Sequence, residues 1–232
     1  QGMFVIEENY PDNWVQTLNV GAGRVRAPAA GSRGTFSQEY DLHYQDIDSS
    51  LNDQIQVSSD PRVIAKSTNR QYNISRRMPN YFLLNGRSFP YTTRESLIVV
   101  GQNERVRLRV LNGGAEEISL HTHGHKVRVT HYDGILHPEE SQITRDVVDI
   151  SPAQRVDLVL DTTDDGLHSY GPGVWLMHDH SAKGVTTNGV NPGGNISAIV
   201  YEDYLGKEGQ PRTMGMDWGP FFSEAYYRKD MP

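Results

Sequence analysis

Two short histidine clusters combine residue types and spacings that could do chemistry. The first occupies residues 121–125 with the sequence His-Thr-His-Gly-His, and the second occupies residues 178–180 with His-Asp-His. Alternate side chains of a β-strand lie on the same face, so residues i and i+2 point together. We therefore expect His121 to point with His123, and His178 to point with His180. If the two strands are neighbours, four imidazoles converge.

Converging imidazoles indicate a metal site. Imidazole suits copper, zinc, iron and nickel, and the 232-residue chain contains no cysteine, so histidines are its natural ligands for such metals. A single His-x-His pair also occurs on solvated surface strands, but two pairs in one small β domain favour metal binding. Asp179 should point to the opposite face, where it could orient a ligand, coordinate the metal itself or be solvated. The direction of His125 after Gly124 stays open.

Short strands separated by turns must position these histidines. Apolar and polar residues alternate in several segments, which is the pattern of a strand with one buried face. No segment has a clear apolar period of 3.6 residues, so we expect little helix. About eight such strands predict an all-β fold, a Greek-key β-sandwich, with strands near residues 40–44, 81–84, 96–100, 105–110, 127–130, 155–160, 174–177 and 196–201.

The chain divides into four parts by composition. Residues 3–7 are similar to residues 198–202, which predicts that residues 1–10 hold the closing strand of a preceding domain. Residues 11–38 are rich in Gly, Ala, Pro and Asn and predict a linker. The β-sandwich then spans residues 39–204. The aromatic tail at 205–232 should dock either on its own sandwich or on a partner.

Composition and charge exclude several classes of function. The net charge is −7 with scattered Lys and Arg, which argues against a nucleic-acid surface and against binding to anionic membranes. No apolar run is long enough for a membrane span. The absence of cysteine excludes disulfides, thiolate metal sites and a cysteine nucleophile. Apolar residues make up 36% of the chain, enough for a packed core.

Five ordered segments resemble the multicopper oxidase family over residues 39–204, one cupredoxin domain. This resemblance implies a cupredoxin-like fold, and residues 1–10 are similar to the end of a preceding cupredoxin domain. The segments are Asn-Gly-Arg at 85–87, Glu-Arg-Val-Arg-Leu-Arg-Val-Leu-Asn at 104–112, the cluster at 121–125, Ile-Ser-Pro-Ala-Gln-Arg-Val-Asp at 150–157 and Gly-Val-Trp-Leu-Met-His-Asp-His at 173–180.

The resemblance implies copper as the cofactor. In the family, such histidine pairs supply half of a three-copper cluster at a domain interface, and a second cupredoxin domain supplies the other half. Carried over to this sequence, His121 takes the type 2 copper role, and His123, His178 and His180 take type 3 roles. The implied partner is another cupredoxin domain or chain, in a hetero- or homo-oligomer.

The sequence departs from the family at the blue type 1 copper site. The family has a cysteine between the second pair of histidines, where this chain has Asp179. The other three ligand positions hold Ile118, Gly184 and Gly189. With no thiolate, imidazole or thioether at these positions, a type 1 site is excluded, so the partner must carry one.

Three hypotheses of function follow. The first is a cupredoxin domain or subunit of an extracellular or periplasmic multicopper oxidase, incomplete by itself, that lends its histidines to a cluster reducing dioxygen. The oxidised substrate stays open among phenols, Fe(II) or Mn(II), and small inorganic nitrogen species. The second is a degenerate cupredoxin module with a structural or assembly role. The third is a mononuclear metal enzyme that uses the four histidines with Asp179. This hypothesis is weaker, because a cupin-like metal site requires a Glu at the position where the chain has Val127.

Overall fold

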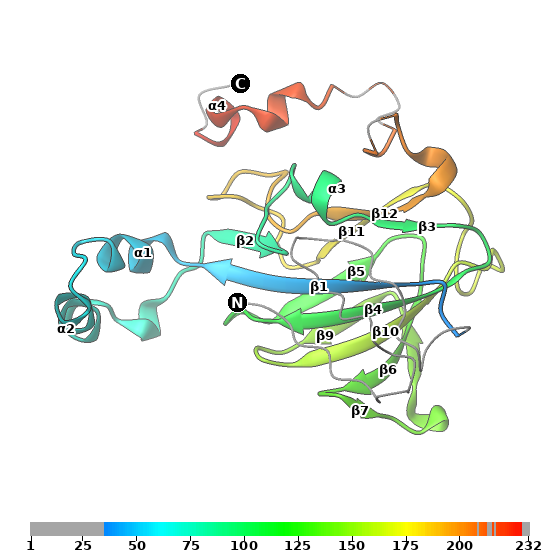
Figure 1. Cartoon of the computed structure of the whole chain (residues 1–232), viewed down its shortest axis with the longest axis horizontal. Coiled ribbons are helices and arrows are strands. Elements are labelled where there is room, and N and C mark those ends of the chain that lie inside the picture. Colours follow the sequence, from blue (N-terminus) through cyan, green and yellow to red (C-terminus); the bar gives the residue numbers. More distant parts are fainter. Residues whose placement is uncertain (1–34, 208, 213–214, 216, 229–232) are drawn as a thin grey trace, which may run out of the picture.

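A computed structural model describes residues 35–207, 209–212, 215 and 217–228 (Figure 1). The closing strand predicted at residues 1–10 lies outside the described residues, as do residues 11–34 of the linker predicted at 11–38. The end of that linker is placed one residue too late, because Gln38 already begins β1. Within the described part, strands run from Gln38 to Tyr201 and form two sheets. The limits of 39–204 as an independent domain stay a prediction.

The two sheets form a β-sandwich, which confirms the predicted all-β fold class. The larger sheet has the order β2 (Tyr81–Leu84), β1 (Gln38–Ile47), β4 (Arg105–Asn112), β10 (Arg155–Asp161), β6 (Val127–Tyr132) and β7 (Ile135–Leu136), with β8 (Ile143–Arg145) also paired to β6. The smaller sheet has the order β3 (Ile98–Val100), β12 (Ser197–Tyr201), β11 (Val174–Asp179), β5 (Ile118–Thr122) and β9 (Val147–Ile150).

The core lies between these sheets. In β4, apolar side chains alternate with arginines, and Val106, Leu108 and Val110 are at most 1% exposed. The alternation arises because one face of the strand packs into the core, while two of the arginines on the other face are half-buried and lie near acidic side chains such as Glu39. Every residue of β12 is buried, as expected for a strand inside the smaller sheet that is covered on both faces.

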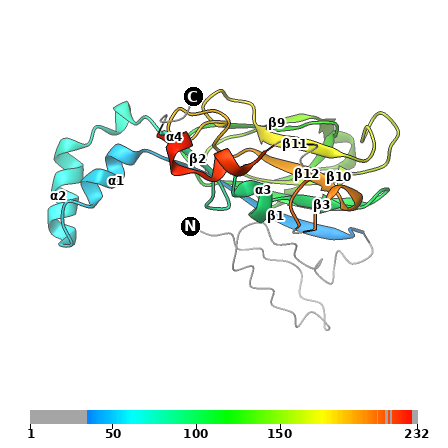
Figure 2. The ribbon, with the colours of Figure 1, turned by 90° about the horizontal axis from the view of Figure 1, so that it is seen from above.

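A helical arm, residues 49–79, leaves the sandwich between β1 and β2. It contains α1 (Ser49–Ile55), α2 (Pro61–Gln71) and a 3₁₀ turn (Ile74–Arg76), and none of these buries a residue. Figures 1 and 2 show the arm standing away from both sheets at one end of the molecule. The sequence did not predict these helices, because they are short and hold too few apolar residues to establish a helical period.

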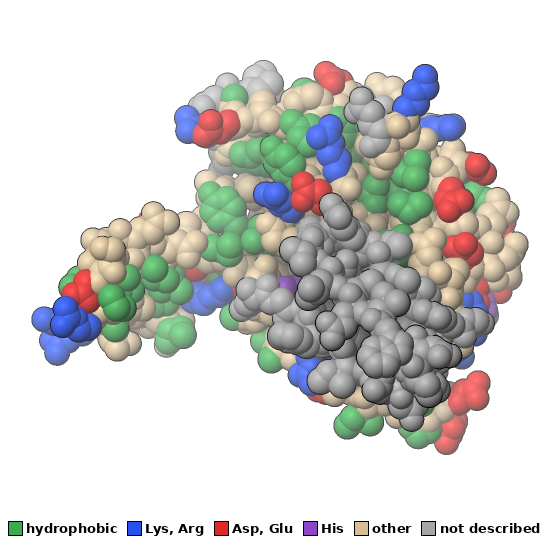
Figure 3. All heavy atoms as spheres, in the orientation of Figure 1, with side chains coloured by type: hydrophobic (Ala, Val, Ile, Leu, Met, Phe, Trp, Pro, Cys, Tyr) green, Lys and Arg blue, Asp and Glu red, His purple; other side chains and the backbone are tan. Residues whose placement is uncertain are grey.

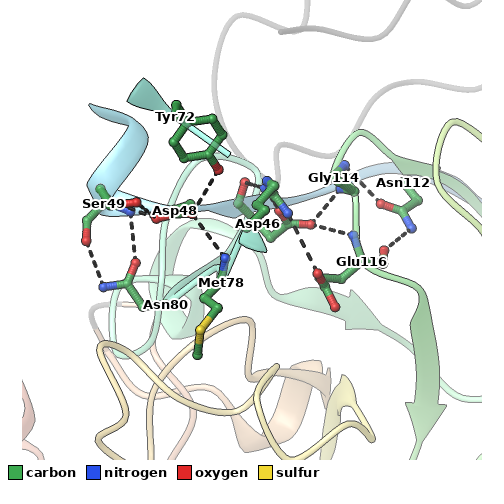
Figure 4. A network of polar contacts seen from close by, with 12 residues as sticks. Asp46, Asp48, Ser49, Tyr72, Met78, Asn80, Asn112, Gly114 and Glu116 are labelled. Carbon is green, nitrogen blue, oxygen red and sulfur yellow. Dashed lines mark hydrogen bonds and ion pairs between the residues drawn. The ribbon is translucent and has the colours of Figure 1, made fainter. Parts of the chain in front are cut away.

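Two aspartates clamp the base of the arm (Figure 4). Asp48 caps α1 by accepting from Ser50 N at 2.9 Å, and it also accepts from Tyr72 Oη at 2.9 Å and from Met78 N at 3.0 Å. The Asp48 carboxylate therefore connects the start of α1 to Tyr72 at the end of α2 and to Met78 after the 3₁₀ turn. The charge of Asp48 at the N-terminus of a helix is also favourable.

The second aspartate, Asp46, ties the arm to the sandwich. One of its oxygens accepts from Ala115 N at 2.7 Å and Glu116 N at 2.9 Å, and the other pairs with Arg77 (Figure 4). The Asp46 side chain is 4% exposed, so solvent screens this ion pair weakly. The arm is thus fixed at its base although its helices bury nothing.

The aromatic tail docks on its own sandwich, which is one of the two alternatives that the sequence left open. Trp218 and Phe221 pack against Phe89 with ring centroids 5.6 and 5.4 Å apart, and Tyr227 Oη donates to the Phe89 carbonyl at 3.0 Å. No helix among the described residues is long and apolar enough to cross a membrane. The remaining short helices are α3 (Thr92–Glu95), α4 (Glu224–Tyr227) and the 3₁₀ turns Glu139–Ser141, Glu202–Tyr204 and Gly219–Phe222.

Candidate metal centre

Antiparallel pairing of β5 with β11 brings the two histidine clusters together. The register places His178 opposite His121 and Met177 opposite Thr122. On β5 the buried residues alternate with half-buried ones, so His121 faces out of the sandwich, and the same alternation turns His178 outward on β11. The outer face of the smaller sheet therefore carries both pairs.

The four paired rings form one group. Ring centroids lie 4.5 Å apart for His121 and His123, 5.3 Å for His121 and His180, and 5.2 Å for His123 and His178. The two remaining contacts, from His178 to His121 and to His180, are both 5.7 Å. The convergence follows from the i, i+2 spacing together with the β5–β11 register.

Backbone carbonyls orient two of these rings. His121 Nδ1 lies 3.0 Å from the Asp146 carbonyl, and His178 Nδ1 lies 2.9 Å from the Asp179 carbonyl. A carbonyl only accepts, so each Nδ1 carries a proton and each Nε2 keeps its lone pair. His123 Nε2 and His178 Nε2 are 3.0 Å apart and share a hydrogen bond. The Nε2 atoms of His123 and His178 thus face each other inside the group.

Burial favours the neutral form of two of these imidazoles. It lowers the pKa of both His123 and His178 below the ordinary value, and neighbouring imidazoles lower both further. Neutral imidazole is the form that coordinates metal, so His123 and His178 resist protonation in the way that a metal ligand requires. Imidazole donors therefore fit copper. That the four histidines of this group bind copper stays a prediction.

His125, the fifth histidine of the clusters, lies in the core and takes no part in the group. Its Nδ1 lies 3.0 Å from the His123 carbonyl and its Nε2 lies 3.1 Å from Tyr201 Oη, while its ring is 1% exposed. The turn needs Gly124, which has φ +65° and sits against the Trp175 ring. His125 therefore anchors the turn that carries His123, with Tyr201 as a partner that the sequence alone did not reveal.

A buried carboxylate fills the position between His178 and His180, where the resemblance expects a cysteine. Asp179 is 2% exposed, and it accepts from Ser119 N and Ser181 N at 3.0 Å each and from Ser181 Oγ at 2.8 Å. A Cβ placed on Gly184 would lie 2.3 Å from Asp179 Oδ2. Ile118 lies directly before Ser119, whose N–H donates to the same carboxylate. Asp179 is thus a buried crosslink between β11 and β5, so its reading as a solvated carboxylate is wrong.

No group of three or more His, Cys, Asp or Glu side chains among the described residues is arranged to hold an ion by itself. The four imidazoles are paired across two strands and open toward the outside of the sheet. Any ion held by these histidines would therefore need further ligands from outside the group.

A family model described as multicopper oxidase matches residues 49–202, well over half of the chain. This chain belongs to the multicopper oxidase family. Membership implies copper as the metal and oxidation–reduction as the class of chemistry. It also confirms the resemblance on which the histidine roles depend, although it assigns no role to any single residue.

Solved structures support this multicopper oxidase fold. The chain is similar to the blue copper oxidase from Nitrosomonas europaea, with TM-score 0.60 and 25% identity over 85% of this chain and 53% of that one. It is also similar to the multicopper oxidase mgLAC, with TM-score 0.59 and 24% identity over 86% of this chain and 55% of that one. The chain therefore spans about half the length of these two relatives. No curated protein matches it.

Proposed function

We propose that this chain is a cupredoxin domain or subunit of a multicopper oxidase that contributes half the histidines of an interdomain copper cluster. The four ligands are His121, His123, His178 and His180. The cluster reduces dioxygen while substrate is oxidised. The observation that carries the proposal is the outward-facing group of four imidazoles, with ring centroids no more than 5.7 Å apart between contacting rings.

The open face of this group supports sharing with a second cupredoxin domain. The neighbouring Leu176 on β11 is 49% exposed, so an apolar side chain is available beside the histidines for contact. Copper bound by imidazoles of one domain alone would keep open positions, and a facing domain would fill them. By the resemblance, His121 serves a type 2 copper and the other three histidines serve type 3 coppers.

Electrons must enter the cluster from the partner. A bound copper cluster supplies the four-electron chemistry that reduces dioxygen to water. In this chain the type 1 positions hold Ile118, Asp179 and Gly184, which offer no soft ligand. The partner domain or chain therefore carries the type 1 site, and this chain's own residues hold and orient neutral imidazoles. The assembly works in the extracellular space or periplasm, as the family resemblance implies.

The experiment is copper content and oxidase rate in the complete assembly. His121→Gln and His178→Gln should each lower the copper bound per chain and reduce the oxidase rate at least tenfold. His168→Gln is the matched control, because His168 pairs with Asp165 at 2.7 Å on an exposed turn outside the group. The copper-loaded isolated chain should lack the intense blue absorption of a copper–thiolate bond. Such a band in this chain alone would overturn the assignment.

The second candidate is a degenerate cupredoxin module with a structural or assembly role. The observation that favours it is the buried Asp179 crosslink, which shows that this sandwich is well packed without a type 1 copper. Under this alternative, the two histidine variants leave both the copper content and the oxidase rate of the assembly at the level of the His168→Gln control.

A further inference from the structure

The helical arm carries an apolar surface with no cover within the described chain. Three of its side chains, Val57, Ile74 and Met78, are 63%, 75% and 74% exposed, and Ile55 and Val63 are 42% and 47% exposed. Figure 3 shows hydrophobic side chains along the arm and Lys and Arg side chains at its tip. Exposed apolar groups gathered on one projecting element are typical of a contact surface.

The arm is also basic within an acidic chain. Residues 49–79 hold five basic residues and two acidic ones, while the whole chain has a net charge of −7. Arg77 pairs with Asp46 at the base, but Lys66 and Arg70 are exposed on α2. A surface that combines apolar groups with positive charge fits a partner that combines apolar groups with negative charge.

A second part of the same chain has that complementary character. The flap, which we define as residues 133–146, includes β7 and β8 at the edge of the larger sheet. Its apolar residues Ile135, Leu136 and Ile143 are 70%, 62% and 44% exposed. It holds four acidic residues and one basic residue. Leu136 also lines an open hollow of about 490 Å³ together with Glu139 of the flap and Arg128 of β6.

The arm and the flap of one chain project from different parts of the sandwich (Figure 1). The arm lies at one end and the flap lies along the lower edge of the view, so the two surfaces do not meet within one chain. We propose that the arm of one copy docks on the flap of a second copy of this chain. Val63, Ile74 and Met78 cover the flap's apolar residues, and Lys66 and Arg70 face Glu139 and Glu140.

The base of the arm makes such docking favourable. The Asp46 and Asp48 clamps hold the arm in place before it binds, so docking orders little additional chain. The contact is heterologous, since different surfaces meet, and repetition of such contacts builds a closed ring or a filament. The proposal goes beyond the proposed function and does not rest on copper.

The absence of native cysteine allows a direct test in the full chain. We would prepare Ile74→Cys in the arm and Leu136→Cys in the flap, mix the two metal-free variants in equal amounts and oxidise them. The mixed disulfide should form roughly tenfold faster than either disulfide between identical variants, because docking raises the effective concentration of the two thiols. Both positions are highly exposed, so the variants should fold as the parent chain does.

The control pairs Ile74→Cys with Leu167→Cys, which is 54% exposed and lies outside the flap. This pair should crosslink no faster than identical variants do. Lys66→Glu with Arg70→Glu in the arm copy should slow the Ile74–Leu136 crosslink, and Glu139→Lys with Glu140→Lys in the flap copy should restore it. Equal rates for all pairs, or an arm-to-arm disulfide as the main product, would overturn the proposal. Either result leaves the copper proposal standing, since no metal is present.

Discussion

Asp179 shows, at the scale of one residue, how a buried carboxylate is stabilised. Its carboxylate accepts three hydrogen bonds from Ser119 and Ser181, and its backbone carbonyl orients the His178 ring. A buried charge is tolerated only when hydrogen bonds replace its hydration, and here they do. The residue that stands at the family's cysteine position therefore holds one candidate ligand in place.

Removing this carboxylate should destabilise the chain. We expect Asp179→Ala to lower the free energy of unfolding by about 2 to 4 kcal/mol, because buried donors lose a charged acceptor. Urea denaturation of the metal-free chain measures this loss. Asp149→Ala is the matched control, since Asp149 accepts one bond from the Ser119 hydroxyl on the exposed face. Equal losses for the two variants would contradict the crosslinking role.

The histidines give the metal-free chain a defined pH dependence. Burial is the main cause that lowers the pKa of His123, His125 and His178 in the folded chain. In the unfolded chain their pKa returns to about 6.5. Below that pH the unfolded state binds more protons than the folded state, so the free energy of unfolding decreases as pH falls.

Urea denaturation across pH 5 to 8 tests this dependence. The double variant His123→Gln with His178→Gln should show a shallower decrease at acid pH than the parent chain. The matched variant His168→Gln should keep the parent's dependence. If the double variant and the parent lose stability in parallel, the folded chain does not hold these two rings neutral.

At the scale of the element, the turn between β5 and β6 decides where His123 points. Gly124 has φ +65°, and a Cβ there would lie 2.3 Å from Trp175 Cε3. Gly134 has φ +83°, and a Cβ placed on it would meet no atom within 4 Å. Alanine at position 134 therefore measures the backbone strain of a left-handed residue without a steric clash. The turn is thus shaped by a left-handed residue and by close contact with a ring from β11.

Gly124→Ala should therefore cost more than Gly134→Ala. Each substitution carries about 1 to 2 kcal/mol of backbone strain, and Gly124→Ala adds about 1 to 3 kcal/mol of overpacking. Gly124→Ala should also reduce copper retention in the assembly, since the Trp175 contact forces the turn to move. Thermal denaturation and copper analysis of both variants measure these effects. Equal melting temperatures would contradict the tight turn.

The clamp at Asp48 should determine how well the arm resists proteolysis. Asp48→Ala removes the acceptor of Ser50, Tyr72 and Met78, so cleavage within residues 49–79 should become several-fold faster. The melting temperature of the sandwich should change little, because the arm helices bury no residue. Asp60→Ala, which removes only the α2 cap, should have a smaller effect. A large loss of melting temperature would show that arm and sandwich unfold together.

Acid should weaken the same clamp. Hydrogen bonding, chiefly from the Ser50 hydroxyl, lowers the pKa of Asp48 to about 2. The unfolded value is near 3.9, so the clamp is fully present above that pH and is lost as the pH falls toward 2.

The sequence predicted the strands better than the helices for a physical reason. Strands such as β2 and β4 bury one face, so alternation in the sequence records their structure. The helices of the arm bury no residue, so no pattern of apolar residues in the sequence marks where they begin and end. The short strands β7 and β8 are fully exposed and were missed for the same reason.

The candidate site was predictable in part. The i, i+2 spacing of His121 with His123 gives the direction of each pair, but the distance between pairs depends on the β5–β11 register, which is a long-range property. The roles of Asp146 and Tyr201 depend on backbone carbonyls and on core packing. No local pattern marks these two residues, so only the structure reveals them.

At the scale of the whole molecule, the metal group should behave as half of a site. Copper retention per chain should fall on serial dilution of the isolated chain and should become independent of dilution once the partner cupredoxin domain is present. The physical reason is that a copper ion whose positions are filled by ligands from two domains exchanges less readily than a copper ion with open positions. Copper analysis after gel filtration measures it. Retention that is tight and independent of dilution in the isolated chain would mean that the site is complete within one chain.

The contact between Asp179 and Gly184 also restricts substitution at both positions. Restoring a histidine at position 184 alone would drive its Cβ to within 2.3 Å of the Asp179 carboxylate. Restoring a cysteine at position 179 alone would deprive three donors of their acceptor without creating a complete copper site. Histidine at position 184 and cysteine at position 179 are therefore each disfavoured while the other position keeps its present residue. Asp179 and Gly184 therefore form one packing unit, in which each residue restricts what the other position can hold.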